Sequence, residues 1–376
     1  MSSVIAEVDS LPKELRDLLA RQGFDPDLFS RLAASVGSDP DTRNRLASGV
    51  SPPAADDVAD LPEKGSDEAS RLERLGLDAL AKGQLAFIVL AGGMATRMGG
   101  VVKALVDAVD GRTFLDLRLA ENNAWSRKAG RDVPLWLMTS HATDGELRKA
   151  LGENLAGDRL DTFVQNVSLR LTSEGRLYRD ADGAPSLYSP GHGDLPEALK
   201  RAGLLQRFVD AGGKYVWIAN IDNLGASVDP LILGWHIDHG APVSVEVVDK
   251  LGSDKGGIPV RWNDRPVILE EFRLPRDFDP TKVRVFNTNT FVVDAQRLAS
   301  LDMDFTWVEV NKKVDGNPAV QFERLIGEIT TALDTRFLRL PRLGAASRFL
   351  PVKDHDELAR RGDEIRAVAQ SRGMLP

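Results

Sequence analysis

Phe87-Ile-Val-Leu-Ala-Gly-Gly-Met-Ala-Thr-Arg-Met-Gly99 is the stretch of this chain that decides its fold. The apolar run from Leu85 to Ala91 is short, rich in branched side chains and followed by paired glycines, which predicts a buried parallel strand. Gly92 and Gly93 let the backbone turn sharply and approach a ligand closely, because neither residue carries a Cβ. Backbone amides exposed in such a turn, with Arg97 beside them, form a pocket for phosphate oxygens. Glycines also follow strands for packing alone, so a nucleotide site and a packing turn both remain open.

Strand-like apolar runs alternate with helical stretches from residue 85 onward. After the first run, the predicted strands are 133–138, 215–219, 243–248 and 291–293. This alternation predicts an α/β fold with a mainly parallel sheet and helices on both faces. Such sheets bind ligands at the carboxyl ends of their strands. Short motifs recur at these ends, which indicates that one site is assembled from several parts of the chain.

Helical patterns precede and follow this α/β region. Leucines between residues 11 and 19 share one helical face, and a second helical patch covers residues 66–81. The proline-bearing segment 51–60 between them predicts a linker or mobile loop. Residues 354–371 predict a charged helix. We therefore divide the chain into a helical N-terminal region at 1–80 that caps the core, a central domain at 81–345 and a C-terminal segment at 346–376.

The composition excludes several classes of protein. A chain of 376 residues, 42% of them hydrophobic, can bury a large core. Its net charge of −8 argues against a nucleic-acid binder, whose footprint would be basic. The lack of cysteine excludes disulfides, thiolate catalysis and cysteine-based zinc sites. We find neither a signal-peptide pattern at the start nor an apolar run near the roughly 20 residues of a membrane helix. We therefore expect a cytoplasmic protein that binds neither nucleic acid nor membranes.

Two motifs combine carboxylates with other polar groups. Pro190-Gly-His-Gly-Asp194 is a glycine-rich turn with an imidazole and a carboxylate, and its alternative interpretation is a helix cap made by Asp194. Ala219-Asn-Ile-Asp-Asn-Leu-Gly225 directly follows a predicted strand. Its carboxylate and amides suit Mg²⁺ bridging to phosphate, because Mg²⁺ takes one or two carboxylates plus substrate oxygens. The alternative is an Asx-rich turn whose side chains satisfy their own backbone.

Two further motifs carry a cation or amides. Asp254-Lys-Gly-Gly257 places a cation beside two flexible residues and is otherwise a hairpin turn. Phe286-Asn-Thr-Asn-Thr290 precedes a predicted strand and would present its amides, Asn287 among them, to sugar hydroxyls or phosphate. His236 and His239 lie in an apolar helical segment, and we expect them to pack or lie at the surface rather than bind metal. No histidine and serine occur in the glycine-elbow context of a hydrolase triad, and the spacing Gly-Gly-x-x-x-Arg is not that of a dinucleotide fingerprint.

In their order along the chain, these motifs resemble those of a known family. Leu90-Ala-Gly-Gly-Met-Ala-Thr-Arg-Met-Gly99 is similar to the nucleotide-binding loop of sugar-phosphate nucleotidyltransferases. The motifs at 190–194, 220–226 and 286–289 and the sequence Ser347-Arg-Phe-Leu-Pro-Val-Lys353 follow in the order seen in UTP–glucose-1-phosphate uridylyltransferases (UDP-glucose pyrophosphorylases). The resemblance covers roughly residues 75–355. It implies a Rossmann-like nucleotidyltransferase fold with its catalytic domain at 81–345.

The resemblance also implies roles for individual residues. Arg97 and Lys103 would neutralise phosphate charge, Asp222 would hold Mg²⁺, and Lys353 matches the lysine regarded as catalytic in the family. Around the nucleotide it places Ala91, Gly92, Gly93, Gln165, Gly191 and His192. At the hexose and its phosphate it places Asn220, Lys255, Gly256, Glu270 and Asn289.

The chain departs from the family pattern in several places. Ala95 stands where the family has a glycine, Val101-Val102 precede Lys103 where the family has a glycine-proline pair, and no Pro-Arg follows Gln165. In eukaryotic members the chain continues after the catalytic lysine into a β-helix domain that supports assembly. Here 23 residues follow Lys353, so we expect a short form without that domain.

The reaction that the resemblance implies is Mg²⁺-assisted synthesis of UDP-glucose and pyrophosphate from UTP and glucose 1-phosphate. An oxygen of the sugar phosphate would attack the α-phosphorus in line, in a protein that is a monomer or a small homo-oligomer. Two alternatives remain open. One is a UTP-dependent pyrophosphorylase for galactose 1-phosphate or N-acetylglucosamine 1-phosphate. The other is a nucleotide-sugar-binding protein without turnover, which the departures from the family pattern motivate.

Overall fold

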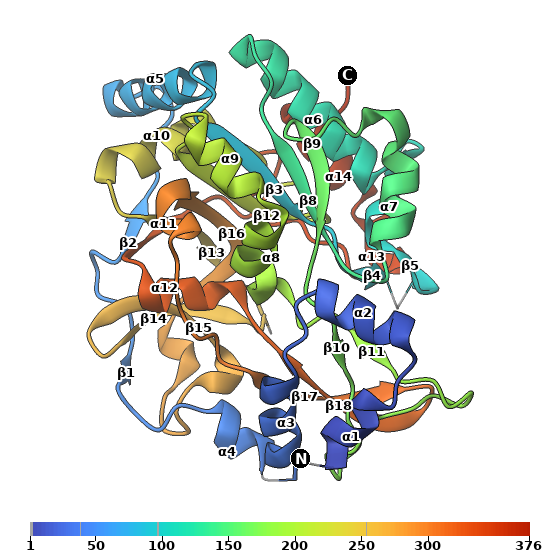
Figure 1. Cartoon of the computed structure of the whole chain (residues 1–376). Coiled ribbons are helices and arrows are strands. Elements are labelled where there is room, and N and C mark those ends of the chain that lie inside the picture. The colour runs from blue at the N-terminus through green and yellow to red at the C-terminus, as the bar shows by residue number, and fades with distance from the viewer. Residues whose placement is uncertain (1–2, 38, 96–97, 253) are drawn as a thin grey trace.

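A twisted eight-stranded sheet forms the centre of the computed structural model, which describes residues 3–37, 39–95, 98–252 and 254–376 (Figure 1). In spatial order its strands are β2 (Val58–Asp60), β19 (Thr335–Arg339), β13 (Val243–Asp249), β16 (Val285–Asp294), β12 (Tyr215–Asn220), β3 (Leu85–Leu90), β8 (Leu135–Thr139) and β9 (Leu160–Val164). β16 runs antiparallel to both of its neighbours, and the other pairs are parallel. The predicted α/β fold with a mainly parallel sheet is confirmed.

Helices cover both faces of the sheet, which explains why β3 is apolar at every position. Leu85, Phe87 and Val89 of β3 pack on one face and the alternate side chains pack on the other. The first face contacts α5 (Asp67–Ala81), α6 (Phe114–Ala129), α7 (Asp144–Leu151), α10 (Pro230–His239) and α14 (Gly362–Ser371). The second contacts α8 (Leu195–Ala202), α9 (Leu204–Asp210) and α11 (Ala295–Ala299).

The predicted strands up to residue 248 are present, with ends that differ by one or two residues, but the last one is much longer than predicted. The motif Phe286–Thr290 lies inside β16 instead of preceding it. The polar side chains of this motif hide the strand pattern in the sequence. A bulge also interrupts the pairing of β16 with β13: Val245 pairs with Phe291 and Val247 with Asn287, so three residues of β16 face one of β13. Asn289 takes a left-handed backbone conformation there, with φ of 58°.

Smaller antiparallel sheets flank the central one. β1 (Val50–Ser51), β14 (Gly257–Trp262) and β15 (Arg265–Glu270) form one, and β17 (Val308–Val314) and β18 (Asn317–Glu323) form a hairpin. The remaining pairs are β4 (Met94–Ala95) with β5 (Val101–Val102), β6 (Asp107–Val109) with β7 (Arg112–Thr113), and β10 (Ser168–Leu169) with β11 (Leu187–Tyr188). One short helix, α12 (Ile329–Ala332), precedes β19.

The predicted N-terminal helical cap is present as α1 (Ser3–Asp9), α2 (Lys13–Arg21), α3 (Pro26–Ser35) and α4 (Pro40–Asn44), below the central sheet in Figure 1. Apolar side chains of this cap, such as Phe29, pack with β10 and β18. Residues 52–57 of the predicted linker form a turn without helix or strand, but the two ends of the segment are strands: β1 pairs with β14, and β2 is an edge strand of the central sheet. The predicted terminal helix is two helices, α13 (His355–Arg360) and α14. The boundaries at residues 80 and 345 stay predictions.

No helix among the described residues is long and apolar enough to cross a membrane.

Helices α5 and α10 pack so closely that each needs a glycine at the contact. A Cβ on Gly76 of α5 would lie 1.9 Å from the carbonyl oxygen of Pro230, and one on Gly234 of α10 would lie 1.8 Å from that of Leu72. The obstacle is backbone in both cases, so no side-chain rotation can make room.

We predict that Gly234→Ala lowers the melting temperature, because the helices must move apart and overpacking of this kind costs about 1–3 kcal/mol. The control is Gly145→Ala in α7, where a Cβ would meet no atom within 4 Å. This substitution should leave the melting temperature unchanged or slightly raised. Equal melting curves for Gly234→Ala and wild type would contradict the packing argument.

Candidate functional site

A cavity of about 510 Å³, here called the central cavity, opens at the carboxyl ends of four neighbouring strands. Gly92 lines it after β3, His141 after β8, Gln165 after β9 and Asp222 after β12. Parallel strands end at the same edge of a sheet, so the topology alone gathers these four positions.

Five of the six residues predicted around the nucleotide line the central cavity: Gly92, Gly93, Gln165, Gly191 and His192. Lys103, Asp222 and Asn220, predicted at phosphate, Mg²⁺ and the hexose, line it as well. Ala91 is not among them, because its N–H donates to the carbonyl of Met138 and its own carbonyl accepts from the hydroxyl of Thr143. The backbone N–H and carbonyl of Ala91 are therefore both used in hydrogen bonds within the protein. Arg97 lies outside the described residues.

Gly92 is in contact with the amide of Gln165. A Cβ at Gly92 would lie 2.0 Å from Gln165 Nε2, whereas one at Gly93 would meet no atom within 4 Å. Gln165 is 6% exposed, and its backbone N–H donates to the carbonyl of Thr139 at 2.9 Å. The glycine turn thus allows the Gln165 amide to lie against the chain at the cavity wall.

His192 presents a neutral imidazole to the central cavity. Its Nδ1 accepts a hydrogen bond from the backbone N–H of Ile326 at 2.9 Å, so the ring proton resides on Nε2. Burial lowers the pKa of His192 to about 4, which keeps the ring neutral at physiological pH. The preceding Gly191 has φ of 108°, and a Cβ there would lie 2.9 Å from the carbonyl oxygen of Arg324. Only glycine fits this turn without strain.

Asp194 occupies the N-cap position of α8, as the helix-cap interpretation expected, but its side chain makes no capping hydrogen bond to the helix. Its Oδ1 accepts from Arg324 Nε at 2.7 Å, and its Oδ2 accepts from the N–H of Asn166 at 3.1 Å. Burial raises the pKa of Asp194 to about 6, against the opposing effect of the Arg324 guanidinium. The backbone N–H of Arg324 also donates to Pro190. This buried pair therefore joins the segment of Gln165 to the segment of His192.

Lys103 and Asp222 form an ion pair in the central cavity. Lys103 Nζ lies 2.5 Å from Asp222 Oδ2, and the backbone N–H of Lys103 donates to the carbonyl of Gly93 at 3.2 Å. Asp222 is 7% exposed, and Lys103 is the only side-chain partner that the described residues give it. The departures from the family pattern before Lys103 therefore do not displace it from the site.

Asp222 fits the predicted Mg²⁺ site as a single carboxylate. The described residues contain no cluster of three or more His, Cys, Asp or Glu side chains able to enclose a metal. Mg²⁺ commonly uses one or two carboxylates and takes its other ligands from substrate phosphates and water. The donor set thus suits an ion that arrives with a phosphate-bearing ligand.

Two buried side chains of α6 hold the loop that carries Asp222. Arg118 donates to the carbonyls of Asn220, Asn223 and Ala226, and it forms an ion pair with Glu121 at 2.8 Å. Glu121 Oε1 accepts from the N–H of the loop residue Val228 at 2.9 Å. The shape of the loop after β12 therefore comes from a neighbouring helix.

The C-terminal motif is clamped to the same loop. Asn223 Nδ2 donates to the carbonyl of Arg348 at 3.1 Å, and its Oδ1 accepts from the N–H of Leu350 at 2.7 Å. The Asx-turn interpretation is wrong for this side chain, because its partners lie in another segment. Arg348 is itself buried, in an ion pair with Glu246 and a hydrogen bond to the carbonyl of Ser227.

Lys353 follows the residues that Asn223 holds, but it is exposed and does not line the central cavity. Its backbone N–H donates to Glu357, and its side chain lies in a surface groove with Asp354, Asp356 and Arg360. The catalytic role implied by the resemblance stays a prediction.

The residues predicted at the hexose lie on β16, around β14 and at the end of β15. The bulge in β16 turns Asn289 toward Asn220, whose Oδ1 accepts from Asn289 Nδ2 at 3.0 Å. Asn287 supports this turn, because its Oδ1 accepts from the N–H of Asn289 at 2.9 Å. Gly256 packs against Phe286, with φ of 149°, and Lys255 is exposed.

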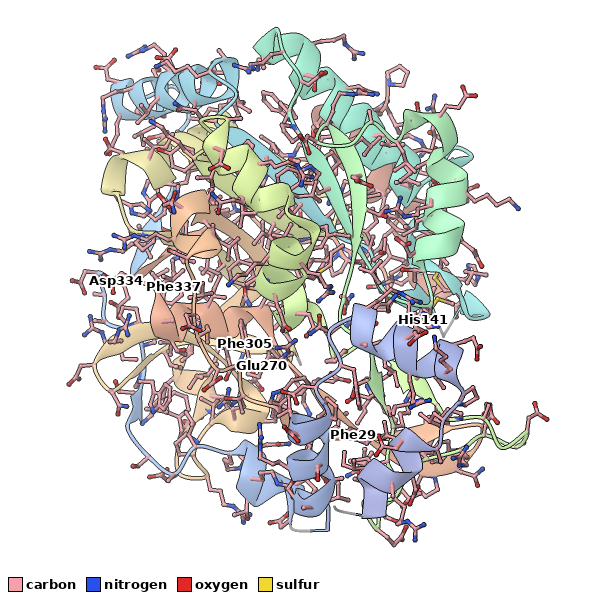
Figure 2. The ribbon with its side chains drawn as sticks, in the orientation of Figure 1. Phe29, His141, Glu270, Phe305, Asp334 and Phe337 are labelled. Atoms are coloured by element: carbon pink, nitrogen blue, oxygen red, sulfur yellow. The ribbon has the colours of Figure 1, made fainter. Side chains whose placement is uncertain are left out.

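Glu270 lies at the end of β15 and lines a second cavity of about 490 Å³, here called the side cavity. The side cavity shares His192 with the central one. Figure 2 shows Glu270 well away from His141, on the side of the molecule that carries β14 and β15. The segment 254–257 is not a hairpin turn, because β13 before it and β14 after it belong to different sheets. The ion pair of Asp254 with Arg342 at 2.6 Å anchors it.

Sequence reasoning missed several residues of the site. Ser140 and His141 line the central cavity directly after β8, and the carboxyl-end rule could have found them. Arg118 in α6 and Arg324 directly after β18 gave no signal, because an isolated arginine looks like a surface residue. The histidines of α10 were placed correctly as packing groups: His236 Nδ1 and His239 Nε2 both contact the hydroxyl of Ser244.

These features define an α/β protein with the fold of a nucleotidyltransferase. The family described as UTP–glucose-1-phosphate uridylyltransferase matches residues 27–365, and the chain belongs to this family. Relatives with that name include one from Musa acuminata, 34% identical over 292 residues that cover 73% of this chain and 62% of the relative. Another, from Encephalitozoon cuniculi, is 31% identical over 290 residues that cover 73% and 57%. The chain thus spans about three fifths of the length of the curated relatives it matches.

Solved structures share the fold at lower sequence identity. A UDP-glucose phosphorylase from Trypanosoma brucei superposes with a TM-score of 0.74 at 22% identity, covering 94% of this chain and 77% of that one. A mutant UDP-glucose pyrophosphorylase from Leishmania major in complex with UDP-glucose gives 0.72 at 22%, with coverage of 95% and 78%. The uridine diphosphate N-acetylglucosamine pyrophosphorylase from Trypanosoma brucei gives 0.71 at 22%, with 99% and 84%.

We predict a pH-dependent effect of Glu270→Gln on stability. Burial, with a smaller contribution from Glu271, raises the pKa of Glu270 from 4.5 to about 7. Between these values the folded state keeps a proton that the unfolded chain has lost, so the free energy of unfolding falls as pH rises. Glutamine cannot ionise. The variant should therefore be more stable than wild type at pH 8, by on the order of 1–2 kcal/mol after allowance for solvent screening.

The measurement is the melting temperature of wild type and variant at pH 5 and pH 8, with the exposed substitution Glu153→Gln as control. A stability difference between Glu270→Gln and wild type that is equal at the two pH values would contradict the assignment.

Proposed function

We propose that this protein transfers the uridylyl group of UTP to glucose 1-phosphate, forming UDP-glucose and releasing pyrophosphate. The observation that carries the proposal is the grouping of the Gly92–Gln165 contact, the neutral His192 and the Lys103–Asp222 pair around one cavity. Membership of the uridylyltransferase family supports the choice of substrates.

The uridine end of the proposed site is built from uncharged groups. The Gln165 amide offers one acceptor and two donors, which can match the carbonyl and N–H groups of a uracil edge. His192 adds a neutral donor at Nε2. Because Gly92 has no side chain, a flat base can approach the backbone closely.

The phosphate end of the proposed site is charged. An oxygen of glucose 1-phosphate forms a bond to the α-phosphorus of UTP, and the bond from that phosphorus to the bridging oxygen breaks, so pyrophosphate leaves with the electron pair. Both reactants are anions, and positioning and charge neutralisation lower the barrier. Lys103 would donate to phosphate oxygens, and Asp222 would hold Mg²⁺. When bound, Mg²⁺ would supply positive charge at the α-phosphate.

The experiment that tests the proposal is pyrophosphate release from UTP and Mg²⁺ with glucose 1-phosphate, galactose 1-phosphate and N-acetylglucosamine 1-phosphate. Turnover with glucose 1-phosphate as the best substrate is the expected result. Binding of UTP or UDP-glucose without turnover of any sugar phosphate would overturn the catalytic proposal. Mass measurement in solution would test the accompanying proposal of a monomer or small homo-oligomer.

We predict that Lys103→Met and Asp222→Asn each lower kcat/KM by about 10²–10³, the usual effect of losing one charge-stabilising group. Each substitution also leaves its partner charge unpaired in a partly buried site, so a lower melting temperature should accompany the loss. Lys149→Met on the exposed face of α7 is the control. Turnover within threefold of wild type in either variant would remove that residue from the proposed mechanism.

We predict a different kinetic pattern for Lys353→Met. The family resemblance implies a catalytic role for Lys353, so kcat should fall. Because the exposed Lys353 does not line the central cavity, UTP binding should be unaffected. Steady-state kinetics with varied UTP separate the two effects. An unchanged kcat would show that Lys353 does not take part in the reaction.

A further inference from the structure

A third cavity, of about 1010 Å³ and here called the edge cavity, lies at the carboxyl ends of β2, β19 and β13. The last residues of these strands, Asp60, Arg339 and Asp249, line it. The antiparallel β16 lies between these strands and the four that end at the central cavity. Ligands of α/β sheets bind at the carboxyl ends of strands, so this edge of the sheet has a second position suited to a ligand.

The loop after β12 borders both the edge cavity and the central cavity. Its Asp222 lines the central cavity, whereas Val228 and the following Asp229 line the edge cavity. Arg348 also lines the edge cavity, and its carbonyl accepts from Asn223 Nδ2 of this loop at 3.1 Å. Among the described residues, none lines both cavities. A ligand in the edge cavity would therefore lie behind the loop that carries Asp222 and leave the central cavity open.

Arg372, directly after α14, brings a guanidinium with few hydrogen bonds to the edge cavity. Its side chain is 17% exposed, and its buried Nε has no hydrogen-bond partner among the described residues. Nη1 lies 3.7 Å from the carboxylate of Asp229, and Nη2 donates to the carbonyl of Ala346 at 3.4 Å. Burial, and then the positive charge of Arg348, lower the pKa of Arg372. A guanidinium carries five N–H donors, so an anion placed here would add hydrogen bonds and stabilise the charge.

Helix α6 places a second cation and an aromatic ring near Arg372. A Cβ on Gly373 would lie 3.6 Å from the Cβ of Ala124, so the segment after α14 packs against this helix. Trp125 and Lys128 of the same helix line the edge cavity, Trp125 half-buried and Lys128 exposed. Lys128 Nζ lies 4.8 Å from the centroid of the Trp125 ring, and no carboxylate among the described residues pairs with it.

The other charged groups that line the edge cavity balance one another. Lys64 before α5 and Glu73 of α5 have no partner of opposite charge among the described residues, so these two charges offset each other. Lys128 and Arg372 thus remain the groups that favour an anion. The pairs are Arg339 with Asp249 at 3.0 Å and with Asp60 at 3.8 Å, Arg342 with Asp254 at 2.6 Å, and Arg348 with Glu246.

The chemistry of the lining suits an organic phosphate that carries a flat ring. Two cations match a phosphate dianion, to which Arg372 can donate two parallel hydrogen bonds. The Trp125 ring offers a flat surface on which another ring can stack. The volume of about 1010 Å³ lies at the upper end of the range for small-molecule sites, about 300–1,000 Å³.

We propose that the edge cavity is a second ligand site, which binds a small organic phosphate with its phosphate at Arg372 and Lys128 and its ring at Trp125. This inference goes beyond the proposed uridylyltransferase function, because it concerns a ligand that the central cavity does not hold. The ligand would lie against Val228 and Asp229, on the side of the loop that faces away from the proposed reaction.

The first experiment measures binding of adenosine 5′-monophosphate to the full chain by calorimetry. This probe has a dianionic phosphate and a flat ring, but it lacks the uracil edge assigned to the central cavity. Lys128→Glu should weaken its binding at least tenfold, because the substitution reverses the charge beside the phosphate. The matched control is Arg127→Glu, the exposed neighbour in the last turn of α6 that does not line the edge cavity, which should stay within twofold of wild type. Absence of binding to wild type at millimolar concentrations, or equal effects of the two substitutions, would overturn the site.

The second experiment tests the assignment of the ring. Inorganic phosphate should bind wild type at least tenfold more weakly than adenosine 5′-monophosphate, and Trp125→Leu should reduce the affinity for the nucleotide to that for inorganic phosphate. Equal affinity of wild type for the two probes would overturn the part of the proposal that concerns Trp125.

The third experiment compares the binding of adenosine 5′-monophosphate without and with saturating UDP-glucose. The two affinities should agree within threefold, because the cavities share no lining residue among those described. Displacement of the probe by UDP-glucose would place it in the central cavity and overturn the proposal. A chain that binds the probe but not UDP-glucose would instead refute the proposed function and leave the second site intact.

Discussion

The loop from Asn220 to Val228 depends on buried side chains that belong to other elements, and the site depends on that loop. Arg118 donates hydrogen bonds to backbone carbonyls of the loop on one side. On the other side, the side chain of Asn223 hydrogen-bonds to the C-terminal motif. Arg118 pairs with Glu121 and Arg348 with Glu246, so each of these two buried guanidinium groups has a carboxylate partner. Asp222 is thereby held on a rigid segment, which reduces the cost of ordering a charged ligand.

Close backbone contacts build the rest of the site in the same manner. Gly92 admits the Gln165 amide, Gly191 admits the carbonyl of Arg324, and Gly225 admits the carbonyl of Ser347, where a Cβ would lie at 2.6 Å. At each position a side chain would separate two segments that the site needs together. These glycines therefore serve packing, and Gly92 and Gly191 also line the central cavity. The two interpretations that the sequence left open at Gly92 are thus not exclusive.

The central and side cavities divide the chemistry of the proposed reaction. Neutral donors and a glycine turn lie at one end, the Lys103–Asp222 pair lies in the middle, and a carboxyl with an amide and an aromatic ring lies beyond His192. The N-terminal region is connected to the last of these through Asn44. The N-terminal region, which the sequence predicted to be a cap on the core, thus also forms part of the wall beside Glu270. The hydrogen bonds of Asn44 to β17 agree with this position.

The resemblance to a family named eight of the 20 described residues that line the central cavity. The sequence by itself determined the α/β class, the helical cap and the strand before the glycine turn. These features are local: strand and helix periodicity, and motifs that end strands. Only the tertiary structure decided that 51–60 contributes strands, that β16 contains its amide motif, and that Arg118 and Arg324 join the segments that line the central cavity. Each of these depends on partners a hundred or more residues away or on a bulge. No local pattern in the chain encodes such long-range contacts, because they form only once the sheet and its helices have packed.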